Sequence, residues 1–213
     1  MRHRTSFYSS LGRLLIESMR NGNEEKFDDF MIPLDASFEQ LRQAILVNPS
    51  PTIAQNEEAK RAFIGICRDV RGLAKEFVKP QFHFLLFEWI YPTYTPLIKR
   101  SLEIWYNEPQ VTTPALRLIA ELVDNREKRN YYDTASDSIY LFREVSSIMV
   151  SLGTRILTLT DVPQENIYPY KLKTISIIFK IIQTSLRAKM NFAVFQLYGD
   201  STLDDLLQMF VKL

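Results

Sequence analysis

Apolar residues recur at steps of three and four along almost the whole chain, and this spacing restricts the fold to packed amphipathic helices. The clearest stripe lies in 57–78 and consists of Ala59, Ala62, Phe63, Ile66, Val70, Leu73 and Phe77. Asn56 is a suitable N-cap, and Glu57 and Glu58 favour the positive end of a helix dipole. We therefore predict a helix over this range, ended near Pro80.

The same spacing predicts further helices, each bounded by turn residues or by proline. They are expected near 7–19, 27–45, 84–90, 97–105, 114–124, 138–157, 165–188 and 203–210. Pro33 predicts a kink or a break, whereas Pro92 and Pro96 predict a split between two helices. Thr113 and Pro114 predict a cap followed by a first-turn proline. Strand signals are nearly absent and glycines are few, which excludes an all-β fold.

The predicted helix starts, near residues 5, 56, 113 and 163, recur roughly every 50 residues, somewhat longer than the spacing of standard HEAT repeats. We therefore predict an all-α, HEAT-repeat-like α-solenoid of about four antiparallel helix pairs, with residues 1–213 forming a single block. Apolar stripes run up to both ends of the sequence without the polar caps that the end repeats of a solenoid need. The block is therefore expected to be a fragment of a longer stack.

Composition narrows the function classes. The net charge is +1, from 26 basic and 25 acidic residues, and this balance disfavours a general binder of nucleic acid or of anionic membranes. The single cysteine, Cys67, cannot form an internal disulfide or a cysteine-based zinc cage, and its place beside a buried stripe predicts a core residue. No signal peptide or glycosylation motif is present, so the cytosol or the nucleus is expected. No apolar run approaches the ~18 residues of a membrane span.

Few residues suggest catalysis. Gly199-Asp200-Ser201 permits a hydrolase with Ser201 as nucleophile, but no histidine follows it and no strand precedes it. A capping pair between Ser201 and Asp204 is the favoured interpretation. His3 and His83 lack the spacing of metal ligands, and His83 is expected to pack in the core. The sequence predicts no catalytic, cofactor-binding or metal-binding residues.

Two groups of residues are candidates for contact with a protein partner. The basic residues Arg126, Lys128 and Arg129 lie in the irregular segment 125–137, although such a cluster is more often a solvated loop. Most aromatic residues between 87 and 106 have the spacing of core residues. Tyr91 and Tyr94 lie next to prolines, and we expect these two to reach the surface.

The longest distinctive motif spans 87–126 and reads FEWIYPTYTPLIKRSLEIWYNEPQVTTPALRLIAELVDNR. It resembles the middle of the exportin-seven family of nuclear transport receptors, the large Ran-binding carriers of the importin-β superfamily. The likeness extends to FYSSLGRLL (7–15), NEEAKRAFIGICRDVRGLA (56–74), YLFREVSSIM (140–149), SLGTRILTL (151–159) and VFQLYGDSTLDDLLQMFVKL (194–213).

The resemblance implies a HEAT-repeat superhelix that binds Ran in its GTP form, protein cargo and nuclear pore proteins. It implies shuttling between cytoplasm and nucleus, no nucleic-acid partner, no membrane insertion and no cofactor. GTP hydrolysis occurs on Ran in this family, so the chain is not expected to be an enzyme. Only middle repeats are matched, which leaves open a truncated helical scaffold without transport activity, and more remotely the hydrolase at Ser201.

Overall fold

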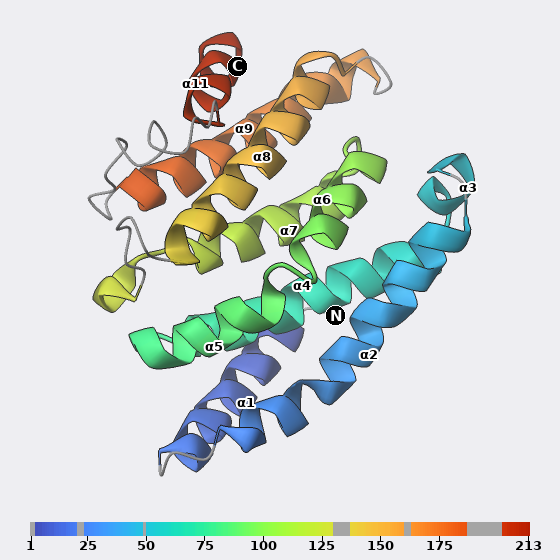
Figure 1. The fold of residues 1–213 in the computed structure, drawn as a ribbon. Coiled ribbons are helices and arrows are strands. Elements are labelled where there is room, and N and C mark those ends of the chain that lie inside the picture. The colour runs from blue at the N-terminus through green and yellow to red at the C-terminus, as the bar shows by residue number, and fades with distance from the viewer. Residues whose placement is uncertain (1–2, 21–23, 49, 130–136, 160–162, 187–201) are drawn as a thin grey trace. The chain divides into compact units, whose positions relative to one another are not determined.

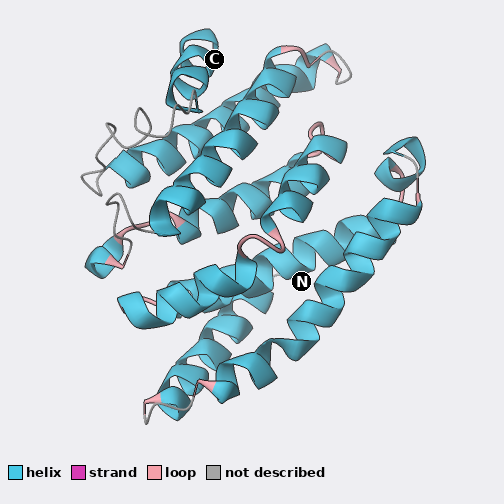
Figure 2. Cartoon of the chain, in the orientation of Figure 1, coloured by secondary structure: helices cyan, strands magenta, loops and turns pink. Residues whose placement is uncertain are grey.

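The computed structural model describes residues 3–20, 24–48, 50–129, 137–159, 163–186 and 202–213, and every regular element in these ranges is a helix (Figure 1; Figure 2). The elements are α1 (Arg4–Met19), α2 (Glu25–Val47), α3 (Ser50–Ala54), α4 (Glu57–Glu76), α5 (Pro80–Ile90), α6 (Thr95–Ile104), α7 (Pro109–Leu122), the 3₁₀ turn η1 (Arg126–Lys128), α8 (Asp137–Leu157), α9 (Gln164–Leu186) and α11 (Thr202–Lys212). The predicted all-α class is confirmed. None of the described helices is long and apolar enough to cross a membrane.

The chain divides into two compact units, Met1–Ile104 and Trp105–Leu213. In the first unit α1 packs on α4, and in the second α7 packs on α9. Each of these contacts joins the first helices of successive helix pairs, which is the neighbour-to-neighbour stacking of HEAT-like repeats. The pairs open at Arg4, Glu57, Pro109 and Gln164, so three of the four predicted starts are confirmed to within a residue.

The close approach of α1 and α4 depends on Gly72. A Cβ atom at residue 72 would lie 2.6 Å from the carbonyl oxygen of Thr5 and 2.7 Å from the Cβ of Tyr8, both on α1. An ion pair also joins the two helices: Arg4 Nε on α1 donates to Asp69 Oδ1 on α4 at 2.8 Å, and the Asp69 side chain is only 1% exposed. Burial raises the pKa of Asp69 above its ordinary value, and the hydrogen bond from Arg4 opposes that shift.

Helix α2 lies along α1 and α4 and runs unbroken through Pro33, so a break at this proline is not observed. A proline inside a helix removes one backbone hydrogen bond, but Pro33 is exposed, where water can satisfy the freed carbonyl. The buried side chains of α2, among them Met31 and Phe38 at 0% exposure, hold the two halves of the helix in register. Packing therefore outweighs the local cost of the proline.

The turn at 48–55 contains the short helix α3, which the sequence pattern did not predict. Helix α4 confirms the predicted cap, since Asn56 Oδ1 accepts a hydrogen bond from the Ala59 amide at 3.0 Å, but Ala62 of the predicted stripe is exposed. Aromatic rings continue the core from α4 to its neighbours: Phe77 lies 6.0 Å from Phe27 on α2 and 6.3 Å from Phe82 on α5, measured between ring centroids. These contacts tie three helices of the first unit together.

In the second unit α8 packs on α11, where Gly153 makes room for the side chain of Met209. The hydroxyl of Tyr170 on α9 donates to the backbone carbonyl of Tyr106 just before α7. Burial raises the pKa of Tyr170 to about 12. Helices α7 and α9 are thereby joined by a buried polar contact as well as by apolar side chains.

The predicted start of α7 is wrong. The helix begins at Pro109, which occupies the first turn, and both Thr113 and Pro114 lie inside it and are buried. Pro109 and Pro114 could each occupy the first turn of a helix, and the local sequence does not show which of them does. Val111 and Thr112 are fully buried, and this burial extends the helix toward Pro109.

Gly72→Ala should destabilise the first unit by about 2 kcal/mol, because the new methyl group meets the backbone of α1 and overpacks the contact. Gly65→Ala is the matched control, since its Cβ would meet only the flexible Arg4 side chain at 3.4 Å. The control should keep wild-type stability or gain up to about 1 kcal/mol from the better helix propensity of alanine. Urea unfolding of both variants measures the difference, and equal stabilities would contradict the close contact.

Candidate protein-interaction sites

The five predicted contact residues lie in two separate turns. Tyr91 and Tyr94 belong to the turn between α5 and α6 in the first unit, and Arg126, Lys128 and Arg129 belong to η1 and its end in the second. Each turn is therefore considered by itself. The surrounding contacts decide which side chains a partner could reach.

Tyr94 is buried, with 8% of its surface exposed, so the expectation that it reaches the surface is wrong. Its ring stacks on Phe38 of α2 with a centroid distance of 4.1 Å. Its hydroxyl donates to Asp35 Oδ1, and the Trp89 indole Nε1 donates to the same oxygen at 2.8 Å. Burial and the Asp35 hydrogen bond raise the pKa of Tyr94 above its ordinary value.

One carboxylate on α2 therefore anchors the end of α5 and the following turn. A charged acceptor that receives two hydrogen bonds from aromatic donors holds both rings in fixed orientations. The sequence gave no sign of this cluster, because Asp35 lies more than fifty residues from both Trp89 and Tyr94. Tyr94 thus positions the turn instead of presenting a contact surface.

Tyr91 ends α5 and is half-buried, with its ring stacked on Phe87 at a centroid distance of 5.3 Å. The peptide bond between Tyr91 and Pro92 is cis. Pro92 and Thr93, next in the chain, are exposed. The accessible part of this turn is therefore the edge of Tyr91 together with these two residues.

Arg129 is also buried, with a fully covered side chain, so its expected exposure is wrong. Its guanidinium turns back onto the end of α7, where Nε donates to the Asp124 carbonyl at 2.5 Å and Nη2 donates to the Glu121 carbonyl. The last carbonyl groups of a helix lack intrahelical partners, and a basic side chain can satisfy them. Arg129 thus caps α7.

Arg126 is partly exposed and pairs with Glu121 and Asp124, the latter at 2.9 Å. Lys128 is exposed, and both Glu127 and Lys128 adopt a positive φ of 55°. Consecutive left-handed residues without glycine are unfavourable and persist only where neighbouring contacts impose them. The ion pairs of Arg126 on one side and the hydrogen bonds of Arg129 on the other supply those contacts. Lys128 is therefore the most accessible of the three predicted cations.

The remaining residues that the sequence analysis considered are the cysteine, one histidine and the segment around Ser201. Cys67 is 1% exposed and its burial raises the pKa of the thiol, in agreement with a core role. His83 is buried on α5, as expected. No group of side chains with metal-ligand character occurs among the residues that the structure describes. Gly199, Asp200 and Ser201, and with them the proposed capping pair, lie outside the described residues.

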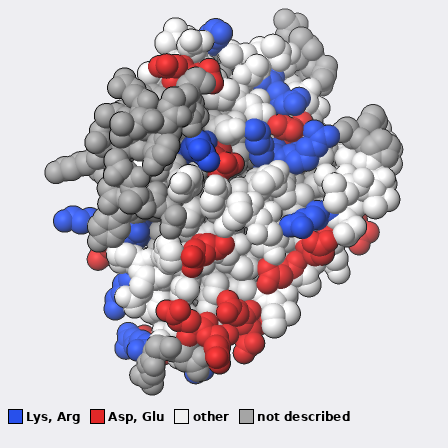
Figure 3. All heavy atoms as spheres, viewed as in Figure 1, with Lys and Arg blue, Asp and Glu red and all other residues white. Residues whose placement is uncertain are grey.

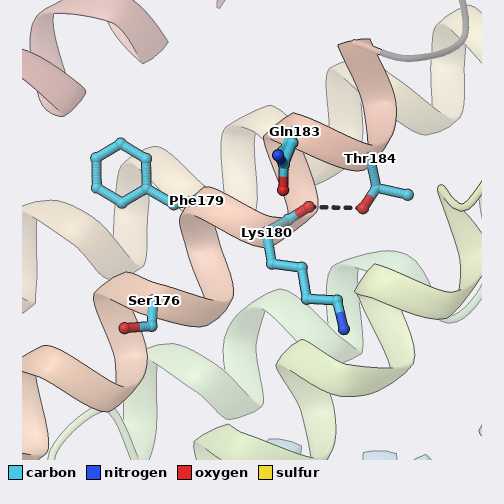
Figure 4. Close-up of a pocket in the computed structure, with 5 residues that line it drawn as sticks. All are labelled: Ser176, Phe179, Lys180, Gln183 and Thr184. Carbon is cyan, nitrogen blue, oxygen red and sulfur yellow. Dashed lines mark hydrogen bonds between the residues drawn. The ribbon is translucent and has the colours of Figure 1, made fainter.

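An open hollow beside α9 is a further candidate that the sequence did not suggest. It is lined by Ser176, Phe179, Lys180, Gln183 and Thr184, and the Thr184 hydroxyl donates to the Lys180 carbonyl at 2.7 Å (Figure 4). Phe179 is 49% exposed there. The sequence pattern gives little sign of this hollow, because only Phe179 of its five lining residues is apolar.

Within each unit the described residues form stacked helical hairpins with accessible turns, which is the architecture of a protein-binding repeat protein. The whole chain aligns with exportin-7-B of Xenopus laevis at 46% identity over 215 residues, and with Ran-binding protein 17 of Mus musculus at 42% over 214. Exportin-7 of Dictyostelium discoideum is 33% identical over 98% of the chain. The chain is therefore homologous, along its whole length, to one segment of the exportin-7 and Ran-binding protein 17 proteins.

The chain spans only 19% of the length of the frog and mouse relatives, in agreement with the expected middle segment. No protein-family model matches the chain, and no solved structure does. The family resemblance carried by 87–126 and its flanking motifs is thereby confirmed.

Asp35→Ala should destabilise the first unit, because Trp89 and Tyr94 each lose an acceptor and an unpaired buried donor costs about 1–3 kcal/mol. Asp35→Asn is the matched control, since the amide oxygen can still accept both hydrogen bonds. The alanine variant should unfold at lower urea concentration than the asparagine variant. Equal midpoints would show that the shared acceptor contributes nothing.

Arg129→Ala should lower the free energy of unfolding of the second unit by about 2–3 kcal/mol, because buried carbonyl groups of α7 lose a charged donor. Lys128→Ala, at the exposed neighbouring position, should change it by less than about 0.5 kcal/mol. Thermal unfolding followed by circular dichroism compares the two variants. A larger effect at Lys128 would contradict the capping role of Arg129.

Proposed function

We propose that this chain acts by binding proteins, as a segment of a Ran-GTP-dependent nuclear transport receptor that exports protein cargo through the nuclear pore. The observation that carries the proposal is the 42–46% identity, over the whole chain, to proteins named exportin-7 and Ran-binding protein 17. The helical-hairpin architecture supports it, because repeats of this kind present extended binding surfaces.

The mechanism would rest on the stacking of hairpins. Each helix pair contacts only its neighbours, so small rotations between pairs add up along a stack. A receptor of this kind could close around cargo and Ran-GTP together. Two ligands that stabilise the same closed form then bind more tightly in each other's presence, and the coupling is reciprocal. In this proposal the units Met1–Ile104 and Trp105–Leu213 are consecutive parts of one HEAT-like block.

The proposed partners are Ran in its GTP form, protein cargo and nuclear pore proteins, met while the receptor shuttles between cytoplasm and nucleus. The proposal assigns no reaction to the chain itself, because nucleotide hydrolysis belongs to Ran. Among the candidate contact residues, Tyr91, Arg126 and Lys128 are accessible enough to touch a partner. Tyr94 and Arg129 would act indirectly, by holding the two turns in place.

A second candidate is a helical scaffold without transport activity. The observation that favours it is the number of large apolar side chains that stay exposed, such as Tyr168 at 72% and Val211 at 89%. Such surfaces support association with other proteins whether or not Ran takes part. For a hydrolase at Ser201 no described residue offers support.

The test is a chimaera in which this chain replaces the homologous segment of Xenopus laevis exportin-7. The chimaera should retain Ran-GTP and not Ran-GDP on an affinity column, with affinity within about tenfold of the parent, a difference of about 1.4 kcal/mol. A matched control carries the same segment with the destabilising Gly72→Ala substitution. Equal retention of both nucleotide forms, or of neither, would contradict the transport function and favour the scaffold.

A further inference from the structure

The first unit contains the joint between the first two helix pairs, α1–α2 and α4–α6, and contacts between several helices cross this joint. Between α1 and α4, a Cβ atom on Gly72 would lie 2.6 Å from a carbonyl oxygen of α1. Arg4 reaches Asp69 on one side of this close approach, and Arg13 Nε donates to Glu76 Oε2 at 2.7 Å on the other. These contacts fix the spacing and the register of α1 and α4.

A contact along one pair of helices still leaves one rotation free. Two cylinders that touch along a line can roll about that line, and such rolling would carry α2 past α4 and past the turn between α5 and α6. In a stack in which each pair contacts only its neighbours, small rotations of this kind add up. The contacts that α2 makes with the second pair therefore decide whether the joint can act as a hinge.

Helix α2 makes contacts that oppose this rotation. Asp35 Oδ1 accepts hydrogen bonds from Trp89 Nε1, at 2.8 Å, and from the Tyr94 hydroxyl. Phe38, three residues further along the same side of α2, stacks on the Tyr94 ring at 4.1 Å and meets the Trp89 ring edge-on at 5.6 Å, measured between centroids. We call Asp35, Phe38, Trp89 and Tyr94 the latch. Because the latch joins α2 to the turn after α5, it lies off the line where α1 and α4 touch.

The short helix α3 adds a second contact, at the carboxyl end of α2. Ile53 on α3 is fully buried, and α3 contacts both α2 and α6. The segment that follows α2 is thereby held against the second pair as well. Contacts at two places along α2 oppose sliding of the helix as well as rolling.

We propose that the latch blocks rotation between the first two helix pairs, so that these pairs move as one rigid body and their joint is not a hinge. Its two donors come from either side of one turn, Trp89 before it and Tyr94 after it. The turn therefore cannot move away from α2 without breaking both hydrogen bonds to Asp35. This inference does not rest on the proposed transport function. If the chain belongs to such a receptor, the rotations that close the receptor occur at other joints.

The distribution of distances between two spin labels tests the rigidity directly. Labels on Gln40→Cys in α2 and Gln81→Cys in α5 report on the joint, because both positions are exposed and the native Cys67 is too buried to react. Pulsed electron paramagnetic resonance of the full chain should give one narrow peak. A broad distribution, or two peaks, would overturn the proposal.

Substitutions on α2 test whether the latch causes the rigidity. Asp35→Ala removes the shared acceptor, so the narrow peak should be lost to a broader distribution. Asp35→Asn, whose amide oxygen can accept both hydrogen bonds, should keep the narrow peak. A narrow peak in the alanine variant would show that the latch does not block the rotation.

A second control separates the latch from the charge of the surface. Acidic side chains gather in the region of α1 and α2 (Figure 3), and Asp29 on α2 is exposed. Asp29→Ala therefore removes one negative charge of the same helix without touching the latch, and it should keep the narrow peak. Loss of the peak in this variant would contradict the proposal, because charge alone would then control the joint.

Amide hydrogen exchange distinguishes a loosened joint from an unfolded chain. In Asp35→Ala the inner amides of α4 should stay protected and exchange only about tenfold faster, as the loss of buried hydrogen bonds predicts. If protection were lost altogether, Tyr94→Phe would replace this variant in the distance measurement, because it removes one donor and leaves the ring on Phe38. Tyr94→Phe should broaden the distribution, and an unchanged narrow peak would overturn the proposal.

Discussion

Helices α1 and α4 lie in direct contact because residue 72 carries no side chain, and the first unit is organised around that contact. Charged side chains that become buried where α1 and α4 meet need partners of opposite charge. Arg4 reaches the buried Asp69, and Arg13 donates to Glu76 at 2.7 Å at the other end of the contact. Helix α2 then covers both helices, and Asp35 on α2 fixes the turn after α5. In the second unit Gly153 on α8 makes room for the Met209 side chain of α11, which is a contact with a side chain and not with a backbone.

Helical periodicity was sufficient to predict most of this architecture, because the apolar stripe, the cap and the end of a helix such as α4 are all encoded locally. It was insufficient at Pro114, since the choice between two first-turn prolines depends on the burial of Val111 and Thr112. It was also insufficient for the helix α3, which is one turn long and has no stripe to reveal it. Local patterns determine what kind of element forms, whereas packing determines where it starts.

The candidate contact residues show the same difference between what local sequence predicts and what packing determines. Tyr94 and Arg129 have residue types that favour exposed, partner-binding positions, yet each satisfies a need of the fold. Tyr94 donates to Asp35, which is far away in the sequence. Arg129 caps α7, and the sequence did not predict where that helix ends. Tyr91 and Lys128, beside them, remain accessible because these neighbours hold the backbone. The homology to exportin-7 and Ran-binding protein 17 came from long motifs, and no single surface residue could have replaced that information.

The Trp89–Asp35 hydrogen bond has a consequence for optical spectroscopy. The chain contains two tryptophans, and Trp89 belongs to the first unit while Trp105 belongs to the second. Trp105 is fully buried, so we expect it to emit at short wavelength. Trp89 is half-buried with its indole N–H bound to a carboxylate, and we expect it to emit at longer wavelength. Each unit therefore contains its own intrinsic fluorophore, and the order in which the two units lose their structure can be read from the unlabelled chain.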